Sequence, residues 1–201
     1  SDKTKAYFNQ GISLMHDFWD FEAYRSFKEA IKNDSAAIMP YWGILQTLGP
    51  DEDSIYMHNK TIAIAQIKKL LPKANEREKL YGEMAILRDS LKEAAYPEII
   101  KKMEFIVHKF PDDVDAKLFL ALFKMSGFDT DMKPMDGQMY SEFLLKDVQR
   151  THPNDHGFHH YWIHLMEHCC PERALASADI LTSLAPMSGH IVHMPGHIYN
   201  R

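Results

Sequence analysis

The chain has 201 residues, of which 45% are hydrophobic and 25% are charged. These are ordinary proportions for a globular protein, and the length suffices for one well-buried domain. The formal net charge of −5 gives no basic footprint, so we exclude nucleic acid as an expected partner. No apolar run approaches about 18 residues, so we expect no membrane-spanning helix. We expect a soluble protein, and its compartment, cytoplasmic or exported, stays open.

Hydrophobic periodicity and helix breakers predict a series of helix pairs and no strands. The first helices of successive pairs are predicted near residues 4–17, 38–48, 76–92, 114–126, 156–169 and 189–201. The second helices are predicted near 20–33, 53–71, 96–109, 138–150 and 172–184. Breaks fall at Gly49-Pro50, Tyr96-Pro97 and Cys170-Pro171, and residues 127–137 form one long irregular insertion. The fold class is therefore all-α, with about five helix pairs and one unpaired C-terminal helix.

An internal repeat accompanies these helices. Residues 4–37 have the small and large positions of a helix–turn–helix unit of about 34 residues, with Gly11 where the two helices cross. The second helix has a packing stripe at Ala23, Phe27 and Ala30. The same spacing recurs at Ala174, Ala178 and Leu181. This pattern is typical of tetratricopeptide repeats (TPRs) and predicts a single TPR-like α-solenoid domain over residues 1–201. Because the last helix lacks a partner, we expect either an N-terminal fragment of a longer protein, which we favour, or a homo-oligomer formed through that helix.

Histidine is concentrated at one end of the chain. Nine of the twelve histidines lie in residues 151–201. Four of them recur every four residues, at His156, His160, His164 and His168, and a second group follows at His190, His193 and His197. Helical residues four apart have Cβ atoms about 5–6 Å apart, so two imidazoles can share one ion. The alternative is a metal-free network of hydrogen-bonded histidines.

In TPR arrays the first helices line a concave groove, and the register of this chain places a polar set on that groove. The set comprises His160, His164, Glu167, His168, His190, His193 and His197. We predict His160, His164, His193 and His197 as primary metal ligands, with Glu167 as a ligand or general base and His190 nearby. Such donors suit zinc first, with copper or nickel as alternatives. His16 and Trp42 suggest a further ligand-holding wall of the groove, but ordinary packing is the commoner explanation of such residues.

Two other features could extend the metal site. His164-Leu165-Met166-Glu167-His168 matches the inverted zinc-protease motif HxxEH, a weak signal because that motif belongs to a different fold. The only cysteines, Cys169 and Cys170, are adjacent. Neighbouring Cβ vectors point apart, so a bond between them is disfavoured. One of the two could join the metal site, or both could be small apolar residues at a helix end.

Several stretches together resemble one family of bacterial TPR proteins, most of them without an assigned function. They are Phe8–Gly11, Phe21–Phe27, Tyr41–Gly43, Leu48–Pro50, Glu76–Tyr81, Phe110–Ala116, His160–Glu167, Pro171–Leu175 and Leu184–Tyr199. The resemblance implies a helical-repeat fold that continues beyond the last tyrosine. It also implies that the histidines of the groove and Glu167 belong to the family pattern, whereas His168 is a local departure. It supplies no reaction.

Two functions of different classes follow. The first is a metal-binding helical-repeat protein. We lean against an enzyme; if it is one, we expect a metal-dependent hydrolase or oxidoreductase, with Glu167 accepting a proton from water. The second is a metal-free scaffold that binds a peptide or partner protein in the groove, because solenoid grooves are extended binding surfaces.

Overall fold

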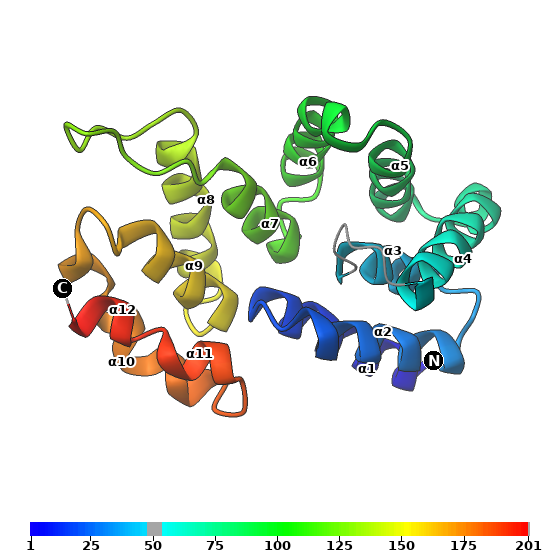
Figure 1. The fold of residues 1–201 in the computed structure, drawn as a ribbon, viewed down its shortest axis with the longest axis horizontal. Coiled ribbons are helices and arrows are strands. Elements are labelled where there is room, and N and C mark those ends of the chain that lie inside the picture. Colours follow the sequence, from blue (N-terminus) through cyan, green and yellow to red (C-terminus); the bar gives the residue numbers. More distant parts are fainter. Residues whose placement is uncertain (48–53, 201) are drawn as a thin grey trace. The chain divides into compact units, whose positions relative to one another are not determined.

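The computed structural model describes residues 1–47 and 54–200, without the side chains of residues 54–57, and this part of the chain is all-helical (Figure 1). No strand occurs in these residues; one isolated bridge joins Phe128 and Pro134 in the predicted irregular insertion. Nor does any of the described helices combine the length and apolar character needed to cross a bilayer. The chain divides into two compact units, Ser1–Phe110 and Pro111–Arg201, which we describe separately. The prediction of a single solenoid domain stays a prediction.

The first unit contains the helices labelled α1 to α6 in Figure 1. Their bounds are α1 (Asp2–His16), α2 (Asp20–Asn33), α3 (Ile38–Thr47), α4 (Ser54–Leu70), η1 (Leu71–Lys73), α5 (Glu76–Leu91), η2 (Lys92–Ala95) and α6 (Tyr96–Lys109). Side chains set the helix starts: the Asn75 amide oxygen accepts from the Glu78 backbone N–H at 3.0 Å, and the Glu78 carboxylate accepts from the Asn75 N–H at 3.1 Å. This reciprocal capping satisfies two donors that a helix start leaves unpaired.

The core of the first unit is organised around the ring of Phe27, which is fully buried together with Ala23 and Ala30. An added Cβ at Gly43 would lie 2.6 Å from that ring, and one at Gly11 would also collide with it. The predicted packing stripe and the close approach at Gly11 are thus confirmed. Only glycine leaves room for the ring between α1 and α3.

The second unit contains α7 (Val114–Lys124), α8 (Gln138–Thr151), α9 (His156–Met166), η3 (Pro171–Ala174), α10 (Leu175–Leu184), α11 (Gly189–His193) and α12 (Gly196–Tyr199). α7 packs on α8 and α8 on α9, while α10 contacts α9, α11 and α12 (Figure 1). The fully buried side chains include Leu145, Phe158, Tyr161, Ile163 and Leu181. α10 is therefore the support that holds α9 and the two short C-terminal helices.

Most of the predicted helices are confirmed, and the differences have local causes. The helix predicted over 189–201 is two short helices, because Pro195 has no N–H to continue the ladder. The helix predicted to reach residue 169 ends at Met166. Val192, an apolar residue of α11, is 45% exposed. The predicted break at Gly49-Pro50 lies outside the described residues.

Gly43 offers a direct test of the packing around Phe27. Gly43→Ala should lower the free energy of unfolding by about 1–3 kcal/mol, the usual cost of overpacking, although alanine is the better helix former. Urea unfolding followed by far-UV circular dichroism measures the change. Gly189→Ala is the matched control, because no atom lies within 4 Å of an added Cβ there. Equal unfolding of the two variants would contradict the close packing of Phe27.

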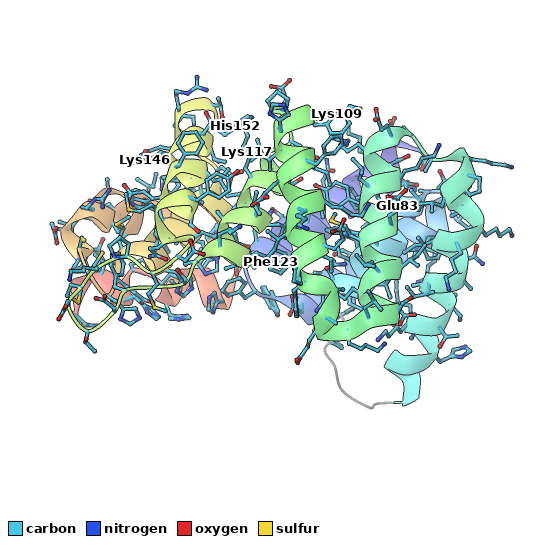
Figure 2. All side chains as sticks on the ribbon, turned by 90° about the horizontal axis from the view of Figure 1, so that it is seen from above. Glu83, Lys109, Lys117, Phe123, Lys146 and His152 are labelled. Carbon is cyan, nitrogen blue, oxygen red and sulfur yellow. The ribbon has the colours of Figure 1, made fainter. Side chains whose placement is uncertain are left out.

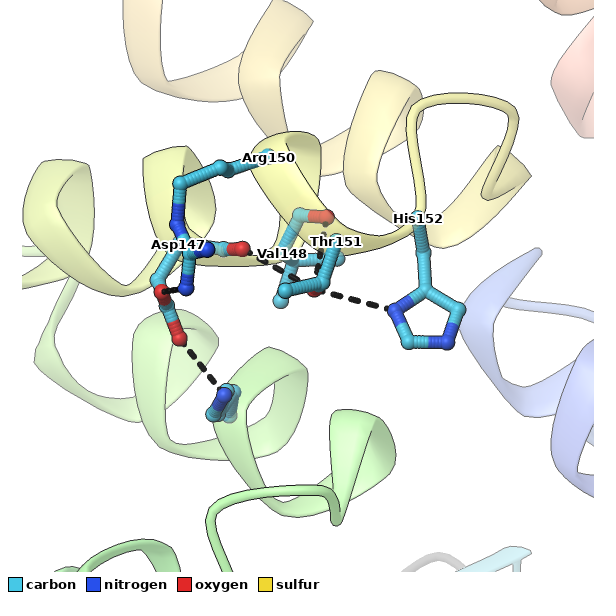
Figure 3. Close-up of polar contacts among 6 residues, drawn as sticks. Asp147, Val148, Arg150, Thr151 and His152 are labelled. Carbon is cyan, nitrogen blue, oxygen red and sulfur yellow. Dashed lines mark hydrogen bonds and ion pairs between the residues drawn. The ribbon is translucent and has the colours of Figure 1, made fainter.

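A buried ion pair joins α7 and α8 in the second unit. The ammonium of Lys117, whose side chain is 7% exposed, donates to Asp147 Oδ2 at 2.6 Å, and Arg150 donates to Asp147 Oδ1 at 2.8 Å. Lys117 is labelled in Figure 2, and Figure 3 shows the contacts of Asp147. The hydrogen bond from Lys117, followed by that from Arg150, holds the pKa of Asp147 below its ordinary value.

Asp147→Asn should therefore destabilise the second unit by about 1–3 kcal/mol, because the buried ammonium loses its charged acceptor. A lowered folded-state pKa means that the carboxylate stabilises the fold above its unfolded pKa of about 3.9 and loses this effect as the pH falls through the folded value. The difference in unfolding free energy between wild type and variant should be full at neutral pH and shrink below about pH 4. Asp131→Asn, which removes an exposed pair with Lys133, should change stability by less than about 1 kcal/mol.

Candidate metal centre

Helix α9 carries two histidines on one face. The helix starts at His156 because the Asp155 carboxylate accepts from the Phe158 N–H at 2.8 Å and caps it. His160 and His164 are four residues apart, and their rings lie 4.9 Å apart between centroids. His160 is fully buried, whereas His164 is partly exposed. Two histidines of the predicted four-residue stripe, His160 and His164, are therefore neighbours on α9.

A third histidine reaches this pair from α11. The Nε2 atoms of His160 and His190 are 3.0 Å apart, and those of His160 and His164 are 3.1 Å apart. One ring nitrogen from each of the three histidines lies within 4.8 Å of the others. His160, His164 and His190 therefore lie close enough together to hold one metal ion.

Glu167, just beyond the last residue of α9, orients two imidazoles. Its Oε1 lies 3.3 Å from His164 Nδ1, and its Oε2 accepts from His197 Nδ1 on α12. Burial alone would raise the pKa of Glu167, but the hydrogen bonds from His197 and His164 outweigh it and hold that pKa below its ordinary value. The residue is thus a carboxylate whose two oxygens are both engaged by histidine N–H groups.

These contacts decide which nitrogen of His164 carries a proton. A carboxylate can only accept, so His164 Nδ1 donates to Glu167. Burial lowers the pKa of His164 more than Glu167 raises it, so the ring is neutral near pH 7. A neutral ring protonated on Nδ1 presents a lone pair on Nε2, the atom that faces His160. A carboxylate–histidine pair of this kind is the usual outer support of a metal-binding imidazole.

The other predicted residues lie outside the group of three nitrogens. The ring of His193 is 4.7 Å from that of His190 and 5.3 Å from that of His197, between centroids, and its side chain is exposed. His197 is held by Glu167. His168 lies past the end of α9, 68% exposed, with its Nε2 3.6 Å from Glu167 Oε1. Within the described residues, none of these three belongs to the group of ligand atoms formed by His160, His164 and His190.

His16 and Trp42 belong to the first unit and are buried there. Trp42 packs edge-on against Tyr81, with ring centroids 5.0 Å apart, which fits the packing interpretation of this residue. His159, beside His160, is structural: its Nε2 donates to the Pro153 carbonyl at 2.8 Å and its Nδ1 faces Ser177 Oγ at 2.9 Å. Burial raises the pKa of the Cys169 thiol to about 12. Among the described residues, Cys169 is not part of the group of ligand atoms formed by His160, His164 and His190.

The structure brings His190, which the sequence analysis placed only nearby, to the pair on α9, whereas His193 and His197 lie outside this group of described residues. The signal was present, since His190 lies one helical turn before His193. Comparison of the chain with protein-family models, curated proteins and solved structures finds no match. Function must therefore be argued from the geometry of the site.

Proposed function

We propose that the chain is a TPR-like helical-repeat protein that binds a divalent transition metal through His160, His164 and His190. The observation that carries the proposal is the convergence of three imidazole nitrogens within 4.8 Å. The proposal places this site on the concave face expected of such a repeat, in line with the resemblance to bacterial TPR proteins. It extends to binding alone and assigns no reaction.

The spacing of the nitrogens fits a zinc-sized ion. Zn–N bonds of 2.0–2.1 Å in a tetrahedron place neighbouring nitrogens about 3.3 Å apart, close to the 3.0 and 3.1 Å found here. Three imidazoles suit zinc, copper or nickel, whereas calcium and magnesium prefer oxygen. An ion held by these three imidazoles would supply Lewis acidity at the site. Glu167 serves as a positioning group, because both its oxygens are engaged by His164 and His197.

A second candidate is the metal-free scaffold that binds a peptide or partner protein in the groove. The short Nε2 contacts of His160 support this candidate, because histidines can also hydrogen-bond one another without a metal. The two candidates differ in their response to chelators. Partner binding that survives metal removal supports the scaffold, and stoichiometric metal supports the centre.

Elemental analysis of the purified, tag-free protein tests the proposal first. We expect about one zinc, copper or nickel ion per chain, lost on chelation and regained from added zinc. His160→Ala, His164→Ala and His190→Ala should each abolish retention of the ion, whereas His168→Ala should keep it because that side chain is 68% exposed and lies outside the group. A protein that neither contains metal nor takes up added zinc would overturn the proposal, as would a His190→Ala protein with full metal content.

The role of Glu167 is tested separately. Glu167→Gln keeps the size of the side chain but leaves only one acceptor atom for two imidazole N–H groups. Metal affinity should fall about 10–100-fold, as is typical when an outer support of a ligand is removed. Competition with a chromophoric zinc chelator measures this affinity, and Glu172→Gln, on the neighbouring 3₁₀ helix, is the matched control. An unchanged affinity would show that Glu167 does not position the ligands.

A further inference from the structure

A cavity of about 450 Å³ lies within the first unit, between α3, α4, α5 and the start of α6 (helices labelled in Figure 1). Its volume falls within the range of about 300–1,000 Å³ that is usual for small-molecule sites. It is lined only by residues of this unit and is therefore independent of the histidine centre.

The lining separates an apolar part from a charged part. Leu45, Ile64 and Ala85 supply apolar surface from three different helices, and Tyr96 adds an aromatic ring. Lys60, Arg88 and Lys92 supply cationic groups, and Asp89 and Glu93 supply carboxylates. Three positive and two negative side chains leave an excess of one positive charge, which suits a singly charged anion better than a phosphate dianion.

Arg88 is the cation with the most unused binding capacity. Its only hydrogen bond in the described part of the chain runs from Nη1 to the neutral Gln46 Oε1, at 3.2 Å. The two lysines instead share one partner, since Lys60 Nζ and Lys92 Nζ lie 3.7 and 3.5 Å from Asp89 Oδ1. A guanidinium has five N–H donors in a planar fork that matches a carboxylate. The half-buried guanidinium of Arg88 thus has N–H donors for a carboxylate beside the apolar part of the lining.

The backbone at the edge of the cavity is strained. Lys92 has φ 53° and ψ −127°, a conformation that costs a non-glycine residue about 1–3 kcal/mol and that is concentrated at ligand-binding sites. This residue ends α5 and starts η2, and together with Glu93 and Tyr96 it lines the cavity. The strained turn therefore brings the charged part of the lining into place.

We propose that this cavity binds a small organic monocarboxylate with an apolar body, its carboxylate on the guanidinium of Arg88 and its body against Leu45, Ile64 and Ala85. Lys60 and Lys92 add long-range attraction while they remain near Asp89. The site is a second binding function of the chain and does not depend on the metal centre.

Isothermal titration of the full chain with 4-phenylbutyrate, and with 4-phenylbutan-1-ol as its uncharged analogue, tests the proposal. The carboxylate should bind saturably, and the alcohol should bind about tenfold or more weaker, because it makes no charge-assisted hydrogen bonds. Arg88→Gln should weaken carboxylate binding to a similar degree and leave the alcohol nearly unaffected. Arg25→Gln, an exposed arginine of α2 paired with Glu22, is the matched control and should bind as wild type does.

Lys60→Gln provides a second variant in case Arg88→Gln disturbs folding, which far-UV circular dichroism reveals. It should weaken carboxylate binding by about threefold, through loss of one partly screened positive charge. Absence of saturable binding of 4-phenylbutyrate, equal binding of the alcohol, or wild-type affinity in the folded variants of both Arg88 and Lys60 would each overturn the proposal.

Discussion

The imidazole of His160 is fully buried, and its Nε2 lies 3.0 Å from His190 Nε2 and 3.1 Å from His164 Nε2. A ring nitrogen carries either one proton or one lone pair, so it cannot form a separate, well-aligned hydrogen bond with each of two others. Poorly satisfied polar atoms in the interior cost free energy. A cation that accepts three lone pairs would remove this conflict, which is the physical argument behind the proposed metal ion.

The order and extent of most helices follow from features visible in the sequence. Pro111 and Pro153 stop helices, Asp113 and Asp155 cap the following ones, and the stripe around Phe27 identifies a buried face. The break between α11 and α12 was missed because the histidine and isoleucine spacing remains helical across it. The backbone at Pro195 also stays close to helical, with φ −55° and ψ −29°. The separation comes from Pro195, which has no N–H to donate, and from the neighbouring N–H groups of Met194 and His197, which bond only three residues back.

The sequence predicts where the site lies better than it predicts which residues form the site. Spacing along α9 identifies His160 and His164, but it cannot decide whether His190, His193 or His197 faces them, since that depends on how α10 sets α11 against α9. The double contact of Glu167 similarly joins parts of the chain that are distant in sequence, since Glu167 and His197 are thirty residues apart. The cavity beside Arg88 depends on residues from Leu45 to Tyr96. The volume of this cavity results from the packing of these helices, and no local sequence pattern predicts it.

The C-terminal segment and the histidine centre depend on each other. α11 has five residues and α12 has four, far shorter than a helix that is stable alone in water. Ile191, Met194 and Ile198 bury their side chains, and α10 packs against both helices. Two polar contacts join these helices to α9 and the residue that follows it: His190 Nε2 lies 3.0 Å from His160 Nε2, and His197 donates to Glu167. Glu167 thus joins the end of α9 to α12 through the same carboxylate that fixes the tautomer of His164, so the position of the third nitrogen and the order of the short helices rest on one set of contacts.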